Sequence, residues 1–367
     1  MPTAFKDSRP ALEVSLAALE RNAEALRERA GGAELAAVVK ADAYGTGSEE
    51  VSRHLAEHCG VRTFFVAFAH EAARVRHAVN RPGIEPCDLY VLNGYSPSEA
   101  STFDLSSLRP VLNSFEQAEA WAARGGACAV GVDVGMNRLG LDANDLEALC
   151  GQTGLSARDV RLVLAHLSHA SQPGAAQNGT QAALFEEVAA ENAQRFPRAR
   201  YSLSNSGGLT LPLSPSEQVS RPGIALYGGS PTGDPAGALE AVARLTAPVL
   251  MTRDVQPGDT AGYDGRWTAE RASRLAVLAI GYADGYLRSL SNRGVVLLGG
   301  AECPVVGTVS MDTLIVDVTD AGDVEVGDRA ELFGPDLPID RVAGLAGTIA
   351  YELLTAVGGR VARVYTR

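Results

Sequence analysis

Lysine is rare in this chain, and one of the two lysines stands where a charged side chain is not expected. Of the 32 Lys and Arg residues, only Lys6 and Lys40 are lysines. Residues 35–40, Leu-Ala-Ala-Val-Val-Lys, predict a buried strand that ends in an ammonium group. Burial lowers the pKa of an amine, so Lys40 could form a Schiff base with a carbonyl compound. The alternative is a buried ion pair with Asp42 or Asp133.

Other polar residues follow other apolar runs, among them Arg138 and His166. Two turns of small residues, 204–208 (Ser-Asn-Ser-Gly-Gly) and 221–224 (Arg-Pro-Gly-Ile), expose backbone amides that could hold a phosphate. For either segment alone, an ordinary tight turn is the alternative. For His166, the alternative is a core histidine bonded to a neighbour. Taken together, the two turns favour a phosphorylated cofactor or substrate.

Strand and helix patterns alternate through the first two thirds of the chain. The expected strands are 35–40, 63–68, 89–92, 109–112, 128–134, 161–166, 200–204 and 218–220. Most are separated by amphipathic segments, at about 15–30, 48–58, 70–79, 114–124, 142–149 and 181–195. About eight such units in an α/β chain favour a (β/α)8 TIM-type barrel, which gathers the residues after its strands at one mouth.

The pattern changes after the Gly- and Pro-rich stretch 228–237. From Leu245 onward, short runs rich in β-branched residues alternate with Gly and Asp turns. We therefore expect a barrel over 11–235, and a second, mainly β domain made of 1–10 and 236–367. Tyr263 and Tyr282 are bracketed by small residues and are expected on exposed turns.

Composition excludes several classes of function. The net charge of −12 disfavours binding to nucleic acid or to anionic membranes. The apolar runs are far shorter than the ~20 residues that cross a bilayer, and residues 1–10 contain no apolar signal core. Five scattered cysteines without a C-x-x-C pair indicate reduced thiols in the cytoplasm and no metal site.

The chain resembles the alanine racemases along its whole length, and the motifs keep the order seen in that family. The segment 38–45, Val-Val-Lys-Ala-Asp-Ala-Tyr-Gly, is similar to the family's pyridoxal-phosphate lysine motif. The other matching segments are 132–140, 166–169, 204–206, 221–228, 262–263, 280–285, 307–312 and 348–355. Eight or more motifs in order make the resemblance specific.

The resemblance implies a racemase that interconverts L- and D-alanine with pyridoxal 5'-phosphate, by a two-base mechanism. Lys40 would hold the cofactor as a Schiff base and act as one base, and Tyr263 of the partner subunit would be the other. The protein would be a head-to-tail homodimer with shared sites. Cofactor contacts are implied for Tyr44, Arg138, His166, Asn205, Ser206, Arg221, Gly223, Ile224 and Tyr351. Substrate contacts are implied for Arg138, Tyr282, Met311 and Asp312.

Two positions depart from the family pattern. Many members carry a modified lysine seven residues before the motif arginine, where this chain has Gly131, so a bound chloride or a nearby Asn would have to orient Arg138. His169 stands where small residues are common. Alternatives within the fold are a serine or broader-specificity racemase and an amino-acid decarboxylase, although Arg221 in place of an acidic residue disfavours decarboxylation. A non-catalytic carrier of the cofactor would need neither Tyr263 nor the β domain.

Overall fold

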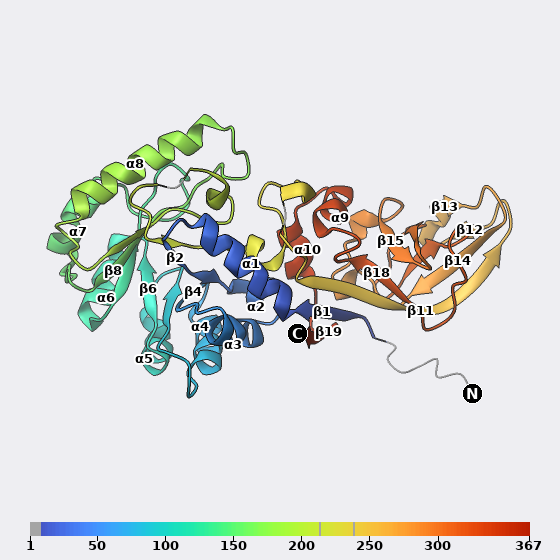
Figure 1. Ribbon diagram of the computed structural model, residues 1–367, viewed down its shortest axis with the longest axis horizontal. Helices are drawn as coiled ribbons and strands as arrows, with labels where there is room; N and C mark the ends of the chain where they lie inside the picture. Colours follow the sequence, from blue (N-terminus) through green and yellow to red (C-terminus); the bar gives the residue numbers. More distant parts are fainter. Residues whose placement is uncertain (1–8, 213, 238) are drawn as a thin grey trace. The chain divides into compact units, whose positions relative to one another are not determined.

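The computed structural model describes residues 9–212, 214–237 and 239–367, so Lys6 lies outside the described residues (Figure 1). The chain divides into two compact units. The described residues of Glu20–Leu226 form the barrel unit, and those of Met1–Leu19 and Tyr227–Arg367 form the β unit. The barrel was expected over 11–235, whereas these units meet at Leu19 and at Leu226. Strand β1 (Ala11–Ser15) belongs to the β unit because it pairs with β11 and β19.

The barrel unit is built on parallel strands with helices outside them (Figure 1). Seven strands pair in chain order from β3 to β9, and β10 pairs with β2. The strands are β2 (Glu34–Leu35), β3 (Ala37–Val38), β4 (Thr63–Val66), β5 (Asp88–Val91), β6 (Arg109–Leu112), β7 (Cys128–Gly131), β8 (Val160–Leu164), β9 (Arg200–Ser202) and β10 (Val219–Ser220). Residues such as Phe64 and Phe65 are fully buried, as in sheets covered on both faces.

Backbone hydrogen bonds on both sides of β10 close the ring of strands. On one side, Ala36 N–H donates to Ser220 O (2.9 Å) and Val38 N–H to Pro222 O (3.0 Å). On the other side, Arg221 N–H donates to Ser204 O (2.8 Å). With β2 and β3 counted as one interrupted strand, the described part of this unit has eight strands, which confirms the expected barrel.

The helices of the barrel unit connect successive strands. They are α1 (Leu16–Arg29), α3 (Ser48–His58), α4 (Ala69–Val79), α5 (Ala100–Ser106), α6 (Phe115–Arg124), α7 (Asp145–Thr153) and α8 (Ala176–Asn192). Helix α1 begins in the β unit and buries Leu19, Ala23 and Leu26 on one stripe. Some expected bounds were wrong: α7 ends later than residue 149, and α8 begins earlier than residue 181 because residues 176–180 continue its hydrogen-bonded turns.

The β unit is built on one mainly antiparallel sheet, as expected for a mainly β domain. The strand order is β16-β15-β18-β11-β1-β19. In addition, β14 pairs with β11, and β17 pairs with β14. The bounds are β11 (Ala243–Val255), β12 (Thr260–Ala261), β13 (Trp267–Thr268), β14 (Ser273–Leu278), β15 (Val295–Leu298), β16 (Ala301–Pro304), β17 (Leu314–Asp317), β18 (Arg329–Phe333), β19 (Ala362–Thr366), and helices α9 (Ile339–Ala346) and α10 (Ala350–Ala356). Within the described residues, no helix is both long enough and apolar enough to span a membrane.

Candidate active site

Lys40 does not end a strand, as the sequence suggested, but begins a left-handed turn. Strand β3 stops at Val38, and Ala41, Asp42, Ala43 and Tyr44 all have φ between 51° and 56°. The left-handed conformation costs on the order of 1–2 kcal/mol for each non-glycine residue. Four such residues in a row therefore need support from their surroundings, and backbone strain of this kind concentrates at functional sites.

Two carboxylates supply this support. Glu71 in α4 accepts a hydrogen bond from Ala41 N–H through Oε1 (2.7 Å), and from Ala67 N–H through Oε2 (2.9 Å). Asp42 Oδ1 accepts hydrogen bonds from the N–H and hydroxyl of Ser48, at 2.8 and 2.9 Å. Glu71 thus links the turn that carries Lys40 to the end of the neighbouring strand β4.

The surroundings of Lys40 favour the neutral amine. Burial lowers the pKa of Lys40, and the positive charge of Arg138 lowers it further, against a smaller opposing effect of Glu71. The structure does not contain the alternative ion pair: Asp42 bonds to Ser48, and Asp133 accepts from Gly135 N–H and Met136 N–H, both at 2.7 Å. Among the residues described, no carboxylate pairs with Lys40. Its amine is therefore suited to attack a carbonyl group.

Arg221 follows β10 and is fully enclosed in the barrel. It donates to the Ser202 hydroxyl and to the carbonyl of Ala165 (2.6 Å), and its guanidinium lies 5.9 Å from the centre of the Phe65 ring. Burial lowers the pKa of Arg221 to about 10, although the negative charge of Glu217 has a smaller effect that raises it. The side chain therefore stays cationic at neutral pH, in a fixed orientation.

His166 lies after β8, and its neighbours fix its tautomer. Asn205 Oδ1 accepts from Gly208 N–H (2.9 Å), so the Asn205 amide nitrogen is the atom 3.1 Å from His166 Nε2. That amide donates, which leaves the ring proton on Nδ1. Burial lowers the pKa of His166 to about 3, and the positive charges of Arg221 and Arg138, with a smaller effect of Lys40 in its protonated form, lower it further. The imidazole is therefore neutral and keeps one N–H to donate.

Ser206, Gly223 and Tyr44 form a small cradle at the same mouth. Ser206 Oγ accepts from Gly223 N–H (2.9 Å) and Ala225 N–H (3.2 Å). A Cβ at Gly223 would lie 2.1 Å from the Tyr44 hydroxyl, so glycine is needed there. Ile224 is fully buried in the short 3-10 helix Ile224–Tyr227 that follows. Hydroxyls and backbone amides beside a glycine suit a phosphate, so the residues present fit a phosphorylated cofactor.

Asn113 occupies the space beside Gly131. Its Nδ2 donates to Leu92 O and Val111 O, both at 2.9 Å, and its Oδ1 would lie 2.4 Å from a Cβ at Gly131. No larger side chain fits at 131 while Asn113 keeps this position. The other departure, His169, has its Nδ1 2.7 Å from the hydroxyl of Ser168, which in turn bonds to Gln181.

The remaining expected site residues lie in the β unit. Tyr263 and Tyr282, in the short 3-10 helices Tyr263–Gly265 and Tyr282–Asp284, are exposed, as expected for turns. Met311 and Asp312 are also exposed. Backbone hydrogen bonds join their loops, such as Tyr282 N–H to Ser310 O (3.0 Å) and Ala283 N–H to Met311 O (3.1 Å). Together these loops present a group of aromatic, thioether and carboxylate side chains to the surroundings.

Tyr351 and Arg360 are the other notable polar residues of this unit. Tyr351 lies in α10, where burial raises the pKa of its hydroxyl to about 12. Arg360 pairs with Asp312 (2.7 Å) and with the buried Asp284 (3.1 Å). Asp284 Oδ2 also accepts from Gly281 N–H (2.9 Å), so one arginine ties the loop of Tyr282 to that of Asp312.

The structure brings Lys40, Arg138, His166 and Arg221 together and joins the loops of Tyr282 and Met311, and it adds three residues that sequence reasoning missed. Glu71 accepts from Ala41 N–H next to Lys40, Asn113 fills the space beside Gly131, and Arg360 pairs with Asp312. Of these, Glu71 left a sequence signal, since a glutamate near the start of a helix often caps it. Its second contact, to Ala41, depends on the packing of α4 against the turn. No local pattern marks Asn113 or Arg360.

Family models match almost the whole chain. Residues 14–231 match the model described as "Alanine racemase, N-terminal domain", and residues 242–365 match "Alanine racemase, C-terminal domain". Among curated proteins, an alanine racemase of Methylobacterium sp. (strain 4-46) is 46% identical over 96% of this chain and 97% of its own length. A protein of Agrobacterium fabrum described as a catabolic alanine racemase is 39% identical, over 96% of this chain and 91% of its own.

Solved structures agree with these relatives. Alanine racemase from Bartonella henselae, solved with covalently bound pyridoxal phosphate, has a TM-score of 0.87 and 34% identity, and covers 98% of this chain and 100% of that one. The biosynthetic enzyme from Pseudomonas aeruginosa has the same TM-score at 32% identity, again with 98% and 100% coverage. The likeness therefore extends over both units.

Proposed function

Because this chain belongs to the alanine racemase family, we propose that its barrel mouth binds pyridoxal phosphate through Lys40 and moves the Cα proton of alanine between two bases. Interconversion of L- and D-alanine is the activity of the family. The observation that carries the residue assignment is the lowered pKa of Lys40 beside Arg138. A neutral amine is the form that condenses with an aldehyde.

The cradle of Tyr44, Ser206, Gly223 and Ile224, with Tyr351, would bind the phosphate. Arg221 and Arg138 would contact the ring, with Asn205 behind His166. When bound, pyridoxal phosphate supplies an electron sink that makes the Cα–H of an attached amino acid acidic. Arg221 would face the ring nitrogen and leave it unprotonated, because a guanidinium is not an acid at neutral pH. That weakens the sink and limits side reactions.

Two bases on opposite faces would carry the proton. Lys40 Nζ, whose pKa is lowered by burial and by Arg138, would exchange it on one face, and the partner subunit's Tyr263 hydroxyl on the other. A tyrosine has a reference pKa of about 10, so its phenolate needs a donor or a cation close by. The neutral His166, with its proton on Nδ1, would supply a hydrogen bond, and the charge of Arg221 would act through space.

The substrate carboxylate would lie between Arg138 of one subunit and the β-unit loops of the partner subunit. We assign substrate contacts to Arg138, Met311, Asp312 and Tyr282. Asp312 is held by Arg360, and the Tyr282 loop is held by the same arginine through Asp284. Arg360 would therefore act as a positioning residue for both.

We assign a homodimer in which each β unit completes the partner's site. The exposed Tyr263, Tyr282 and Met311 support this, because neighbouring large apolar side chains on a surface mark an interaction site. A cytoplasmic location belongs to the same proposal, supported by five cysteines that are all free thiols.

Labelling and turnover assays test the assignment. Borohydride reduction of the loaded protein, followed by peptide mapping, should find the cofactor on Lys40 and not on Lys6. A label elsewhere would overturn the assignment. Single enantiomers of alanine, serine and lysine should be assayed alongside; alanine should be racemised in both directions, and a faster reaction with serine or lysine would contradict the alanine assignment.

Mixed dimers test the shared site. Lys40→Ala and Tyr263→Phe should each be inactive. A dimer of one Lys40→Ala subunit and one Tyr263→Phe subunit would contain one site with both defects and one intact site. Random exchange of equal amounts makes half the dimers mixed, so activity should return to about a quarter of wild type. Confirmed subunit exchange with no recovery would reject the contribution from the partner.

A further inference from the structure

A second polar cavity lies at the end of the barrel opposite Lys40. Its volume is about 360 Å³, and several of its lining residues are the first residues of successive parallel strands. Glu34 begins β2, Thr63 begins β4, Asp88 begins β5 and Arg109 begins β6. Lys40, His166 and Arg221 instead follow the carboxyl ends of their strands. The cavity is therefore separate from the candidate active site.

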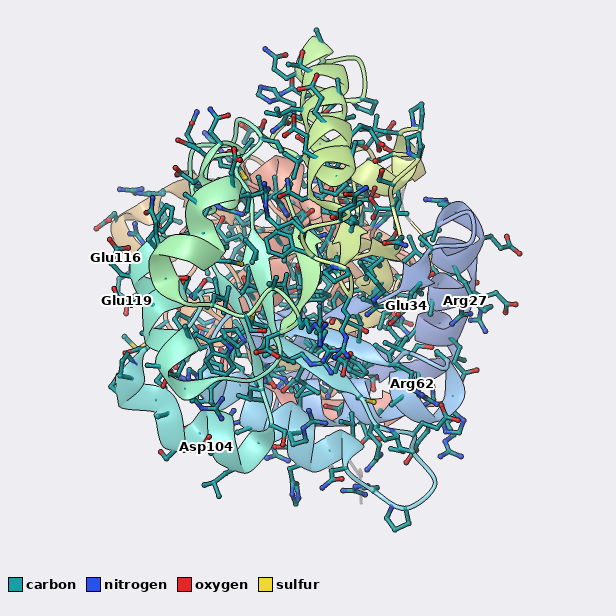
Figure 2. The ribbon with its side chains drawn as sticks, turned by 90° about the vertical axis from the view of Figure 1, so that its left-hand side faces the viewer. Arg27, Glu34, Arg62, Asp104, Glu116 and Glu119 are labelled. Carbon is teal, nitrogen blue, oxygen red and sulfur yellow. The ribbon has the colours of Figure 1, made fainter. Side chains whose placement is uncertain are left out.

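The lining is strongly cationic in a chain that is acidic overall. Five arginines line the cavity: Arg62, Arg109, Arg161, Arg198 and Arg200. Only two carboxylates, Glu34 and Asp88, line it as well, whereas the whole chain carries a net charge of −12. Figure 2 shows Glu34 and Arg62 well away from the exposed Asp104, Glu116 and Glu119 on the other side of the unit. Those outer carboxylates do not neutralise the cavity.

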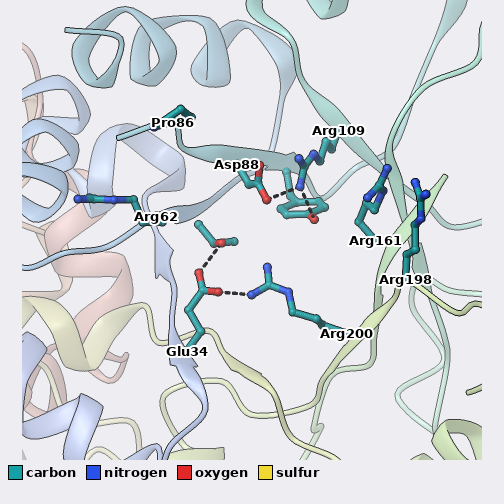
Figure 3. A pocket seen from close by; sticks show the side chains of 10 residues that line it. Glu34, Arg62, Pro86, Asp88, Arg109, Arg161, Arg198 and Arg200 are labelled. Carbon is teal, nitrogen blue, oxygen red and sulfur yellow. Dashed lines mark hydrogen bonds and ion pairs between the residues drawn. The ribbon is translucent and has the colours of Figure 1, made fainter. Parts of the chain in front are cut away.

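Both lining carboxylates already have partners (Figure 3). Glu34 accepts hydrogen bonds from Arg200 and from the Thr63 hydroxyl (2.6 Å). Asp88 pairs with Arg109, whose guanidinium also donates to the Tyr90 hydroxyl (3.1 Å).

Arg62 is held differently. It donates to the carbonyls of Ala56 (2.6 Å) and Val61 (3.0 Å), and its carboxylate partner, Glu85, is exposed and does not line the cavity.

Arg161 and Arg198 are left without an anion. Arg161 comes from β8 and Arg198 from the turn before β9, and the two side chains point the same way in Figure 3. Within the described ranges, neither side chain forms a hydrogen bond or an ion pair, and Arg161 Nε is buried without an acceptor. An unpaired buried donor and neighbouring like charges are both unfavourable. A bound anion would satisfy both residues.

We propose that this cavity binds a compact phosphate polyanion, such as inorganic pyrophosphate or the polyphosphate end of a nucleotide. Arginine forks match phosphate oxygens in pairs, and two free forks with a surplus of cations suit an anion of more than one charge. The concave shape and the cavity volume suit a small ion, and the overall negative charge disfavours nucleic acid.

The test uses the protein loaded with its cofactor, so that phosphate binding at the opposite mouth does not contribute. Calorimetry and thermal unfolding are measured with pyrophosphate, ATP and citrate, in wild type, Arg198→Gln and Arg161→Gln/Arg198→Gln. Arg74→Gln, an exposed arginine of α4 outside the cavity, is the matched control. Arg198 is itself exposed, so its single variant should fold even if the double variant does not.

Pyrophosphate should bind the wild type and Arg74→Gln equally, raise their melting temperatures, and bind the double variant about tenfold or more weakly. Arg198→Gln should fall between them. Without ligand, the double variant should be no less stable than the wild type, because it removes two unpaired charges. Binding of both ATP and pyrophosphate would identify a nucleotide as a source of the bound polyphosphate. Binding of pyrophosphate without ATP would identify an inorganic polyphosphate as the ligand. No binding to wild type, equal binding to all variants, or tighter binding of citrate than of either phosphate compound would overturn the proposal.

Discussion

The Glu71 carboxylate lies 2.7 Å from the backbone nitrogen of Ala41, the residue that follows Lys40. Its other oxygen accepts from the end of β4, at Ala67 N–H and Phe68 N–H. One side chain thus fixes the strained turn to the strand beside it, and its negative charge opposes the fall in the pKa of Lys40. Glu71 therefore positions the amine and adjusts its charge.

Glu71→Gln should lower both the stability of the protein and the pKa of Lys40. One amide oxygen cannot accept every hydrogen bond that two carboxylate oxygens accept. The free energy of unfolding should therefore fall by about 1–2 kcal/mol. Urea denaturation measures the free energy of unfolding. The pKa of Lys40 is measured in the cofactor-free protein, from the pH dependence of the rate at which an amine-reactive reagent modifies Lys40. Glu49→Gln, an exposed change in α3, is the control. An unchanged pH profile would show that Glu71 does not act on the amine.

His166 should make the protein less stable at acidic pH. Its pKa is about 3 when folded and ~6.5 when unfolded, so between these values the unfolded chain binds more protons. The contribution of His166 is therefore full above pH 6.5 and decreases as the pH falls toward 3. Urea denaturation from pH 7.5 to 4.5 should show a smaller loss of stability in His166→Gln than in wild type. The exposed His77→Gln should behave as wild type, and parallel curves for all three proteins would contradict the prediction.

Gly131 and Asn113 should be energetically coupled. Gly131→Ala forces a methyl group to within 2.4 Å of Asn113 Oδ1, which should cost about 1–3 kcal/mol. Asn113→Ala removes that clash, so the double variant should lose at least about 1 kcal/mol less stability than the sum of the single variants. Chemical denaturation of all four proteins gives the coupling. Gly151→Ala in α7, where a Cβ meets no atom within 4 Å, should be neutral or stabilising. Additive single effects would show that Asn113 moves freely out of the way.

Gly223→Ala should weaken cofactor binding more than it weakens the fold. The new Cβ would lie 2.1 Å from the Tyr44 hydroxyl, so Tyr44 must leave the cradle. We expect the dissociation constant of pyridoxal phosphate to rise about tenfold or more, measured by absorbance titration of the cofactor-free protein. Gly174→Ala, in open space, is the control. Unaltered affinity in Gly223→Ala would place the phosphate elsewhere.

Much of the fold could be predicted from the sequence because its signals are local. The apolar runs and amphipathic segments between 35 and 220 set eight strands and their helices, and the β-branched runs after Leu245 set the second sheet. Small residues around Tyr263 and Tyr282 correctly indicated exposed turns. The motif order gave the family, which the family models and relatives confirm.

Element ends were less predictable, and the turn at Lys40 shows why. Ala41, Asp42, Ala43 and Tyr44 do not form a local pattern that indicates four left-handed residues, so the sequence predicted only a strand that ends at Lys40. The turn forms because Glu71 and Ser48, from two other helices, bond to it. The energy that stabilises it comes from outside the segment.

The sequence by itself determined the barrel, the β domain, the family and the residue types at the mouth. Tertiary structure alone decided which side chains meet. It placed Arg138 beside Lys40, Asn113 in the space beside Gly131, and Arg161 with Arg198 at the opposite end of the barrel. The physical reason is that propensity and hydrophobic period act over a few residues, whereas burial, pKa and charge pairing depend on side chains that only closure of the strand ring brings into contact.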